Sequence, residues 1–183
     1  MKLRHCVPAC LLLLIPAMAQ QARLRLDLPA VAARASEVSD VTLDGAALRL
    51  GMAFVNHDSD VSPQERDMLS RLQGIYVKSY EFDHGASVTD ADLEPIRAQL
   101  RGPGWTRMVR VQQRDRGRGD ETDEVYLCTD ASGNIQGMAV LSRQANELDV
   151  VNIIGRIEPS ELAALGGHLG IPKLDLKDKE KGK

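Results

Sequence analysis

This chain of 183 residues has few cysteines and few aromatic side chains, and its one long apolar run lies at the start. Cys6 and Cys10 lie in that first segment, so only Cys128 can belong to a folded domain. A single cysteine excludes an intramolecular disulfide, and the core must hold without a covalent link. Within the strand-like run EVYLCTD we expect Cys128 to be a small buried residue; an intermolecular disulfide and a nucleophile are the alternatives.

The sequence also lacks the motifs that bind metals or phosphates and those that support nucleophilic catalysis. His57, His84 and His168 are scattered and do not have the spacing of zinc ligands. The acidic run at residues 56–60 is not followed by the glycine and glutamate of a calcium-binding EF-hand loop. No phosphate-binding loop, dinucleotide-binding glycine pattern or nucleophile elbow is present. We therefore predict no catalytic residues, no metal site and no cofactor.

The first nineteen residues have the three parts of a cleaved secretory signal peptide. Lys2 and Arg4 are the positive start, residues 7–16 are the apolar centre, and Ala17-Met18-Ala19 is the small-residue cleavage site. The apolar centre is shorter than the about 20 residues that a membrane-spanning helix needs. We expect cleavage before Gln20 and a periplasmic or secreted protein that is not lipidated.

The chain that remains is mildly acidic and long enough for one domain. Two of the 23 Lys and Arg residues precede the cleavage site and all 26 acidic residues follow it, so the net charge becomes −5. A negative charge without a basic stripe argues against a nucleic-acid partner. No later apolar stretch reaches membrane-spanning length, so we expect no membrane span.

Hydrophobic periodicity and turn residues divide residues 20–172 into short elements. Between residues 46 and 55, good helix formers without β-branching favour a helix, although the alternation of apolar residues leaves a strand open. The pattern predicts helices over residues 28–37, 46–55, 63–73, 93–101 and 159–165, and strands over residues 38–43, 75–82, 105–113, 124–129, 135–142 and 148–155.

Two helix starts have specific end signals. Ser62-Pro63-Gln64-Glu65 is a capping box with proline at the first helical position. In the other helix, Pro95 must lie in the first turn, so we expect Asp92 to be the N-cap residue.

The order of these elements predicts a single α+β domain. A strand-helix-strand-helix first half precedes an antiparallel sheet and a final helix, because the short loops between the last four strands favour antiparallel neighbours. Residues 114–123 are expected to form a charged loop, and the Arg118-Gly119-Asp120 tripeptide within it resembles an adhesion motif that such loops contain by chance. Residues 173–183 alternate lysine with acid and predict a disordered tail. The strand order stays open.

Asn152 is the one amide in an apolar strand, LDVVNIIGRI. On a strand it shares a face with Leu148, Val150 and Ile154, so we expect burial, and a buried amide must be hydrogen-bonded. Because Gly155 and Glu158-Pro159 follow, the strand is expected to end at Gly155. A structural amide that ties this turn is favoured, and a contact with a ligand or partner is the alternative.

Five segments together resemble bacterial domain-of-unknown-function family 4252, from about residue 41 to residue 172. The Gly104-Trp105 step and the VVNIIGRI strand are the most specific parts, and Trp105 therefore joins Asn152 as a candidate partner contact. The segments are VTLDGAALRL, LQGIYVKSYEFD, IRAQLRGPGWTRMVRV, EVYLCTDASGNIQGMAVL and ELDVVNIIGRIEPSELAALGGHLGIP.

The resemblance implies a small exported protein without assigned chemistry. Some members are encoded near sigma-factor and anti-sigma-factor genes, which implies a role in envelope regulation. We expect a non-enzymatic envelope protein that binds an unknown envelope partner, and a homo-oligomer stays open. A carrier or sensor of a small apolar ligand is the second hypothesis, although few aromatic side chains are available to line a pocket. An undescribed hydrolase is the third.

Overall fold

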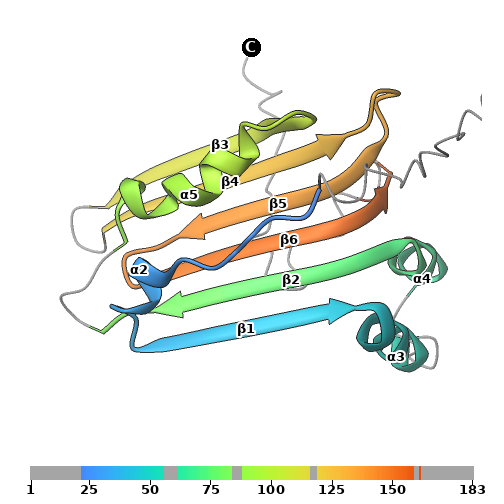
Figure 1. Cartoon of the computed structure of the whole chain (residues 1–183), viewed down its shortest axis with the longest axis horizontal. Helices are drawn as coiled ribbons and strands as arrows, with labels where there is room; N and C mark the ends of the chain where they lie inside the picture. The colour runs from blue at the N-terminus through green and yellow to red at the C-terminus, as the bar shows by residue number, and fades with distance from the viewer. Residues whose placement is uncertain (1–21, 56–61, 84–87, 116–118, 159–160, 162–183) are drawn as a thin grey trace, which may run out of the picture.

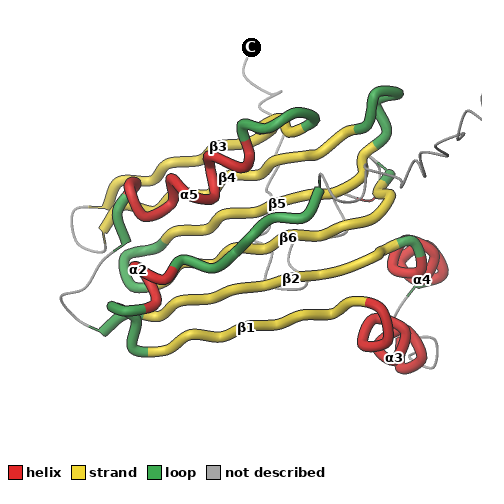
Figure 2. The backbone as a smooth tube through the Cα atoms, in the orientation of Figure 1, coloured by secondary structure: helices red, strands yellow, loops and turns green. Residues whose placement is uncertain are grey.

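The structure is a computed structural model that describes residues 22–55, 62–83, 88–115, 119–158 and 161. Its centre is a six-stranded antiparallel sheet, with the short helices at one face and at one end (Figures 1 and 2). The elements are α2 (Pro29–Ala32), β1 (Glu37–Asp44), α3 (Gly45–Val55), α4 (Pro63–Ser70), β2 (Leu72–Glu81), the 3-10 helix η1 (Asp90–Leu93), α5 (Glu94–Leu100), β3 (Trp105–Asp115), β4 (Gly119–Thr129), β5 (Ile135–Arg143) and β6 (Glu147–Ile157).

The strand order in the sheet is β1-β2-β6-β5-β4-β3. Strands β3 to β6 follow one another along the chain as an antiparallel meander, as their short loops predict. Strand β2 lies between β1 and β6 and is antiparallel to both, so the two halves of the chain form one continuous sheet. The observed architecture confirms the mixed α+β class.

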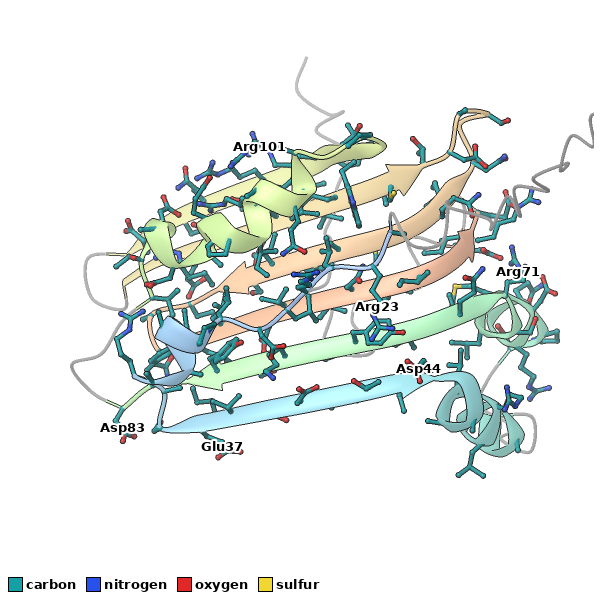
Figure 3. All side chains as sticks on the ribbon, in the orientation of Figure 1. Arg23, Glu37, Asp44, Arg71, Asp83 and Arg101 are labelled. Carbon is teal, nitrogen blue, oxygen red and sulfur yellow. The ribbon has the colours of Figure 1, made fainter. Side chains whose placement is uncertain are left out.

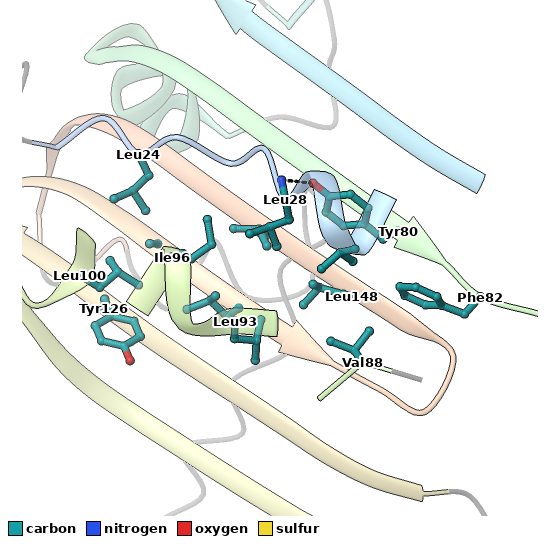
Figure 4. Close-up of a cluster of buried hydrophobic side chains, with 14 residues drawn as sticks. Leu24, Leu28, Tyr80, Phe82, Val88, Leu93, Ile96, Leu100, Tyr126 and Leu148 are labelled. Atoms are coloured by element: carbon teal, nitrogen blue, oxygen red, sulfur yellow. Dashed lines mark hydrogen bonds between the residues drawn. The ribbon is translucent and has the colours of Figure 1, made fainter. Parts of the chain in front are cut away.

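Each face of the sheet has its own hydrophobic cluster. On the front face, which is turned toward the viewer in Figure 1, α2, α5 and the chain before α2 cover the strands. The front cluster includes Tyr80, Leu93, Ile96 and Leu148, all with an exposed fraction of 1% or less (Figure 4). The back cluster contains buried β-branched and methionine side chains, and α3 and α4 contribute Leu48, Met68 and Leu69 at one end of it.

Two helix predictions need correction. The predicted helix over residues 28–37 is only the four-residue α2, and Glu37 already pairs with Glu81 in the sheet. Four alanines favour a helix, but so short a segment does not nucleate one without tertiary contacts. Helix α4 ends at Ser70 and not at Gly74, because Leu72 and Gly74 pair with β6. The helix chosen for residues 46–55 is confirmed as α3.

The 3-10 helix η1 also begins differently from the prediction. Asp92 is not its N-cap but its third residue; the cap is Thr89, whose backbone N–H donates to the Asp92 carboxylate at 2.8 Å. The Thr89 hydroxyl donates to the same oxygen at 2.8 Å, so Asp92 closes a capping box from inside the helix.

Two predictions about strand ends are wrong. Residues 114–123 are not a charged loop: β3 continues to Asp115 and β4 begins at Gly119, with Arg114 opposite Asp120. Arg110 of β3 lies opposite Glu124 of β4 with its guanidinium 3.6 Å from the carboxylate, so opposite charges on paired strands favour strand structure in this charged part of the chain. Strand β6 continues past Gly155 to Ile157. Of the predicted helix over residues 159–165 the structure describes residue 161 alone, and the charged tail lies outside the described residues.

Candidate functional site

Asn152 lies at the centre of the front face and is fully buried. Its side-chain oxygen accepts a hydrogen bond from the Leu24 backbone N–H at 3.0 Å. Its side-chain nitrogen donates to the backbone oxygens of Ala22 at 3.0 Å and Met138 at 3.2 Å. The predicted burial and hydrogen bonding of Asn152 are therefore confirmed, but its main partners lie almost at the opposite end of the chain and not in the turn after β6.

Two further side chains hold the same stretch of backbone. Gln99 of α5 accepts from the Arg25 N–H at 2.8 Å and donates to the Arg25 carbonyl at 3.0 Å. The Tyr80 hydroxyl of β2 accepts from the Leu28 N–H at 3.0 Å and donates to the Leu26 carbonyl at 3.1 Å (Figure 4 shows the bond to Leu28). We call Asn152, Gln99 and Tyr80 the clamp residues and residues 22–28 the N-terminal segment.

The clamp residues together make six hydrogen bonds to the backbone of the N-terminal segment. Each clamp side chain both donates and accepts, as the backbone of a neighbouring strand would. Six backbone groups of the segment thus have hydrogen-bond partners although the segment is not a strand of the sheet, and it crosses the front face over β6 and β5 (Figure 1). Its recognition depends on backbone groups and extended shape.

Side chains of the N-terminal segment alternate between the sheet and the solvent. Ala22, Leu24 and Leu28 are buried with exposed fractions of 6% or less, whereas Arg23 and Arg25 are exposed. This alternation is visible in ARLRLDL, and it is the sequence signal that could have identified the segment. The sequence does not show which side chains bind the segment, because these partners lie 52 to 130 residues away along the chain.

Gly137 of β5 gives the segment room to approach the sheet. A Cβ atom at this position would lie 3.0 Å from the Cβ of Ala22 and 2.9 Å from the Ile153 carbonyl oxygen. Both distances are shorter than ordinary van der Waals contact, so any larger residue must displace backbone.

An open groove runs beside the N-terminal segment above β1 and β2. Its volume is about 330 Å³, and Arg23, Arg25, Asp27, Asp40 and Lys78 line it together with four uncharged residues. The groove therefore presents three cations and two carboxylates within one small surface.

The side chains at the floor of the groove are already ordered by one another. The guanidinium carbon of Arg23 lies 4.3 Å from the centre of the Tyr76 ring, and the Tyr76 hydroxyl donates to Asp44 at 3.0 Å (Figure 3). The Lys78 amine contacts Asp40 at 2.7 Å and Asp27 at 2.9 Å. These hydrogen bonds, chiefly the one to Asp40, raise the pKa of Lys78, which stays cationic.

Trp105 begins β3 and is partly buried on the same front face. In the register of the sheet it lies opposite Cys128, and it packs against the small cluster of Ala22, Tyr76, Cys128 and Ile154. The structure therefore brings both candidate residues to the start of the N-terminal segment: Asn152 holds the backbone of Ala22, and Trp105 packs beside the same cluster. Cys128 is a free buried thiol whose pKa is raised by burial, as expected of a small core residue.

A second cluster of titratable groups lies under α5. Glu124 of β4 has an exposed fraction of 1% and accepts from Arg97 at 2.7 Å and from the Tyr126 hydroxyl at 2.5 Å. Arg110 approaches the same carboxylate at 3.6 Å. Burial alone would raise the pKa of Glu124, but the hydrogen bonds from Tyr126 and Arg97 outweigh it and the pKa is lowered. With its oxygens occupied, this carboxylate ties α5 to the sheet.

Among the described residues, no group of three His, Cys, Asp or Glu side chains is arranged to hold a metal ion. The three histidines considered as zinc ligands, His57, His84 and His168, lie outside those residues. None of the helices in the described ranges has the length and hydrophobicity needed to cross a bilayer.

Comparison with known proteins identifies one family. A family model described as a domain of unknown function (DUF4252) matches residues 33–165, which confirms the resemblance seen in the sequence. The matched range includes all three clamp residues and begins after the N-terminal segment. No curated protein and no solved structure matches the chain significantly.

Proposed function

The chain belongs to the family of domains of unknown function DUF4252, and from this premise we propose that it is an exported, non-enzymatic envelope protein that acts by binding a partner protein. The groove beside the N-terminal segment carries this proposal. Hydrogen bonds from the clamp residues hold the backbone that carries Arg23, Arg25 and Asp27, and the Lys78 amine contacts Asp27 and Asp40. Preordered charges of both signs suit a protein surface of complementary charge and cost little side-chain entropy on binding.

Export places this groove close to the new N-terminus. Cleavage before Gln20 leaves only two residues ahead of Ala22, the first residue held by Asn152. A partner bound at the groove therefore lies beside the mature N-terminus, in the periplasm or outside the cell. A regulatory role in the envelope would then consist of presenting or masking this surface.

The export step has a direct test. Mass spectrometry of the protein recovered from the periplasm is expected to show a chain that begins at Gln20, without the first nineteen residues. Recovery of an uncleaved or acylated chain would contradict export by a cleaved signal peptide.

Site-specific photo-crosslinking tests the binding surface. A photo-crosslinking residue in place of Arg25, which lines the groove, should give a covalent product with one envelope protein in intact cells. The matched control replaces Arg101, an exposed arginine that directly follows α5 and is not part of the groove lining, and should give no such product. Equal yields from both positions, or none from position 25, would reject the groove as the binding surface.

The alternative ligand classes have weaker support. An apolar ligand on the front face would have to displace Leu24 and Leu28, which are already buried in the front cluster. A hydrolase would need an accessible acid or nucleophile, whereas Glu124 and Cys128 are buried. Binding of a partner protein at the groove requires neither displacement of these leucines nor exposure of Glu124 or Cys128.

A further inference from the structure

The exposed apolar side chains of the sheet lie on its two edge strands. Among the described residues, the exposed large hydrophobic side chains are Val38 (42%) and Val41 (41%) on β1, Met108 (60%) and Val111 (42%) on β3, and Leu50 (61%) on α3. The outer edges of β1 and β3 pair with no other strand in the described part of the chain. Each edge therefore combines free backbone hydrogen-bonding groups with two exposed apolar side chains, which is the chemistry that another strand binds.

The two edge strands have opposite charge. Strand β1, EVSDVTLD, contains three acidic residues and no base. Strand β3, WTRMVRVQQRD, contains three arginines and one aspartate. Acidic side chains on one edge and arginines on the other favour contact between unlike edges and disfavour contact between like edges.

The number of strands makes contact between unlike edges geometrically simple. All five neighbouring pairs in the sheet are antiparallel, so with six strands β1 and β3 run in opposite directions. A second copy shifted sideways in the plane of the sheet thus places its β3 antiparallel to β1 of the first. The shift keeps the front faces of both copies on the same side. The front cluster of one copy therefore lies next to the front cluster of the other, and the two back clusters are likewise neighbours.

We propose that β1 of one copy binds β3 of a second copy and that the protein self-associates by extending its antiparallel sheet. On the front face, charges alternate across the junction. Lys78 contacts Asp40 within the first copy, and Arg110 contacts Glu124 within the second. The junction brings Asp40 and Arg110 to neighbouring strands, which completes an alternating row from Lys78 to Glu124.

The back face of the junction is apolar. The register puts Val41 opposite Val77 and Val111 opposite Asp123, whose neighbours along β4 include the back-face residue Val125. Both valines therefore lie on the back face, and the junction brings them to adjacent strands. Because β1 and β3 are different surfaces, each bound copy still offers one free edge, and the assembly is open-ended and not a closed dimer.

Sedimentation velocity of the mature chain tests this association. The weight-average mass is expected to exceed the monomer mass and to rise with protein concentration at low salt. It should fall toward the monomer in about 1 M salt, where charges are screened beyond about 3 Å. A monomer at every concentration in low salt would overturn the proposal.

Single-edge variants identify which surfaces meet. Val41→Lys puts a cation, and Val111→Glu puts an acid, into the apolar back face of the junction, where each charge would lose its water beside a valine of the neighbouring copy. Each variant alone should be monomeric, because every junction needs both edges. An equimolar mixture should associate again, because the unaltered β1 of one variant meets the unaltered β3 of the other.

A control variant and the opposite results complete the test of pairing between β1 and β3. Leu50→Lys, at an exposed position of α3 outside both edge strands, is the control and should leave the mass distribution unchanged. Association of either single-edge variant alone, or a mixture that stays monomeric, would overturn pairing of β1 with β3. Circular dichroism melting of each variant should match the parent chain, since all three positions are more than 40% exposed.

Discussion

Asn152 does for the N-terminal segment what the backbone of a neighbouring strand does in a sheet. It accepts from Leu24 N–H and donates to the Ala22 carbonyl, which are the two groups that a paired strand residue would use. Its third bond, to the Met138 carbonyl, holds the amide in the orientation that makes this pairing possible. One fully buried side chain thereby fixes the start of the N-terminal segment on the sheet.

Replacing Asn152 tests this role directly. Asn152→Ala should lower the free energy of unfolding by about 1–3 kcal/mol, the usual cost of leaving buried polar groups unpaired. Asn152→Asp should be more destabilising, because its carboxylate would face the Ala22 and Met138 carbonyl oxygens. Urea denaturation measures both, and Gln144→Ala on the exposed surface is the control, with no expected change. An unchanged midpoint for Asn152→Ala would favour a ligand contact over the structural role.

Gly137 is the second residue on which the approach of the segment depends. Gly137→Val should destabilise the fold by about 1–3 kcal/mol, because its side chain would overlap Ala22 and the Ile153 carbonyl oxygen. Gly133, at φ 84° with no atom within 4 Å of an added Cβ, tests backbone strain without crowding. Gly137 does not have a positive φ, so an unchanged stability of Gly137→Val would show that the N-terminal segment and the Ile153 carbonyl do not crowd this position.

At the scale of elements, α5 is joined to the sheet by the buried Glu124 carboxylate. Arg97 of α5 donates to Glu124 of β4 and also contacts Asp90 at 3.1 Å, so one guanidinium links the helix, the turn before it and the sheet. Hydrogen bonds from Arg97 also lower the pKa of Asp90. The position of Gln99, and with it one third of the clamp, depends on this anchored helix.

The anchor of α5 predicts a specific dependence on pH. Because the pKa of Glu124 is lower in the folded protein than its ordinary value of 4.5, its stabilising contribution is present above pH 4.5 and is lost as the pH falls below that value. Glu124→Gln should lower the free energy of unfolding at pH 7 by about 3 kcal/mol, which is the lower end of the cost of breaking a buried ion pair. The lower end is expected because Arg97 retains its ion pair with Asp90 in the variant.

Denaturation of parent and variant at a series of pH values measures this effect. The difference in stability between parent and Glu124→Gln should shrink as the pH is lowered from 5 toward 3, since the parent then loses the same charge. A difference that stays constant over this range would show that the charge of Glu124 does not anchor the helix.

At the scale of the whole molecule, the N-terminal segment completes the front face. Leu24 and Leu28 are two of the buried residues of the front cluster, and no strand of the sheet supplies replacements for them. Burial of two leucines contributes about 3–6 kcal/mol. That is a large fraction of the about 5–15 kcal/mol by which domains of this size are stable.

Deleting residues 20–28 from the mature chain should therefore lower the melting temperature sharply or prevent folding. A synthetic peptide of the same nine residues should restore part of the stability, because the clamp residues recognise its backbone. Truncation after Pro172 is the control and should leave the melting temperature unchanged, since Leu174 and Leu176 are the only large apolar residues of the tail that it removes. Calorimetry of the two deletions distinguishes them, and equal losses would show that the N-terminal segment has no special role.

The sequence alone determined the local elements and the family. Alternation of apolar residues predicted the strand at residues 38–43, and good helix formers predicted the helix at 46–55. The apolar neighbours of Asn152 predicted its burial. These features depend on residues within one or two turns or on one face of one strand, so short-range patterns contain the information.

Only the tertiary structure decided the rest. The insertion of β2 between β1 and β6, the charged β3–β4 hairpin and the clamp all depend on partners in other elements. Asn152 and Ala22 are 130 residues apart, and neither residue's own neighbours indicate the other. Local propensity sets what a segment can form, but long-range pairing and burial decide which of those forms is stable, because most of the favourable free energy comes from contacts between elements.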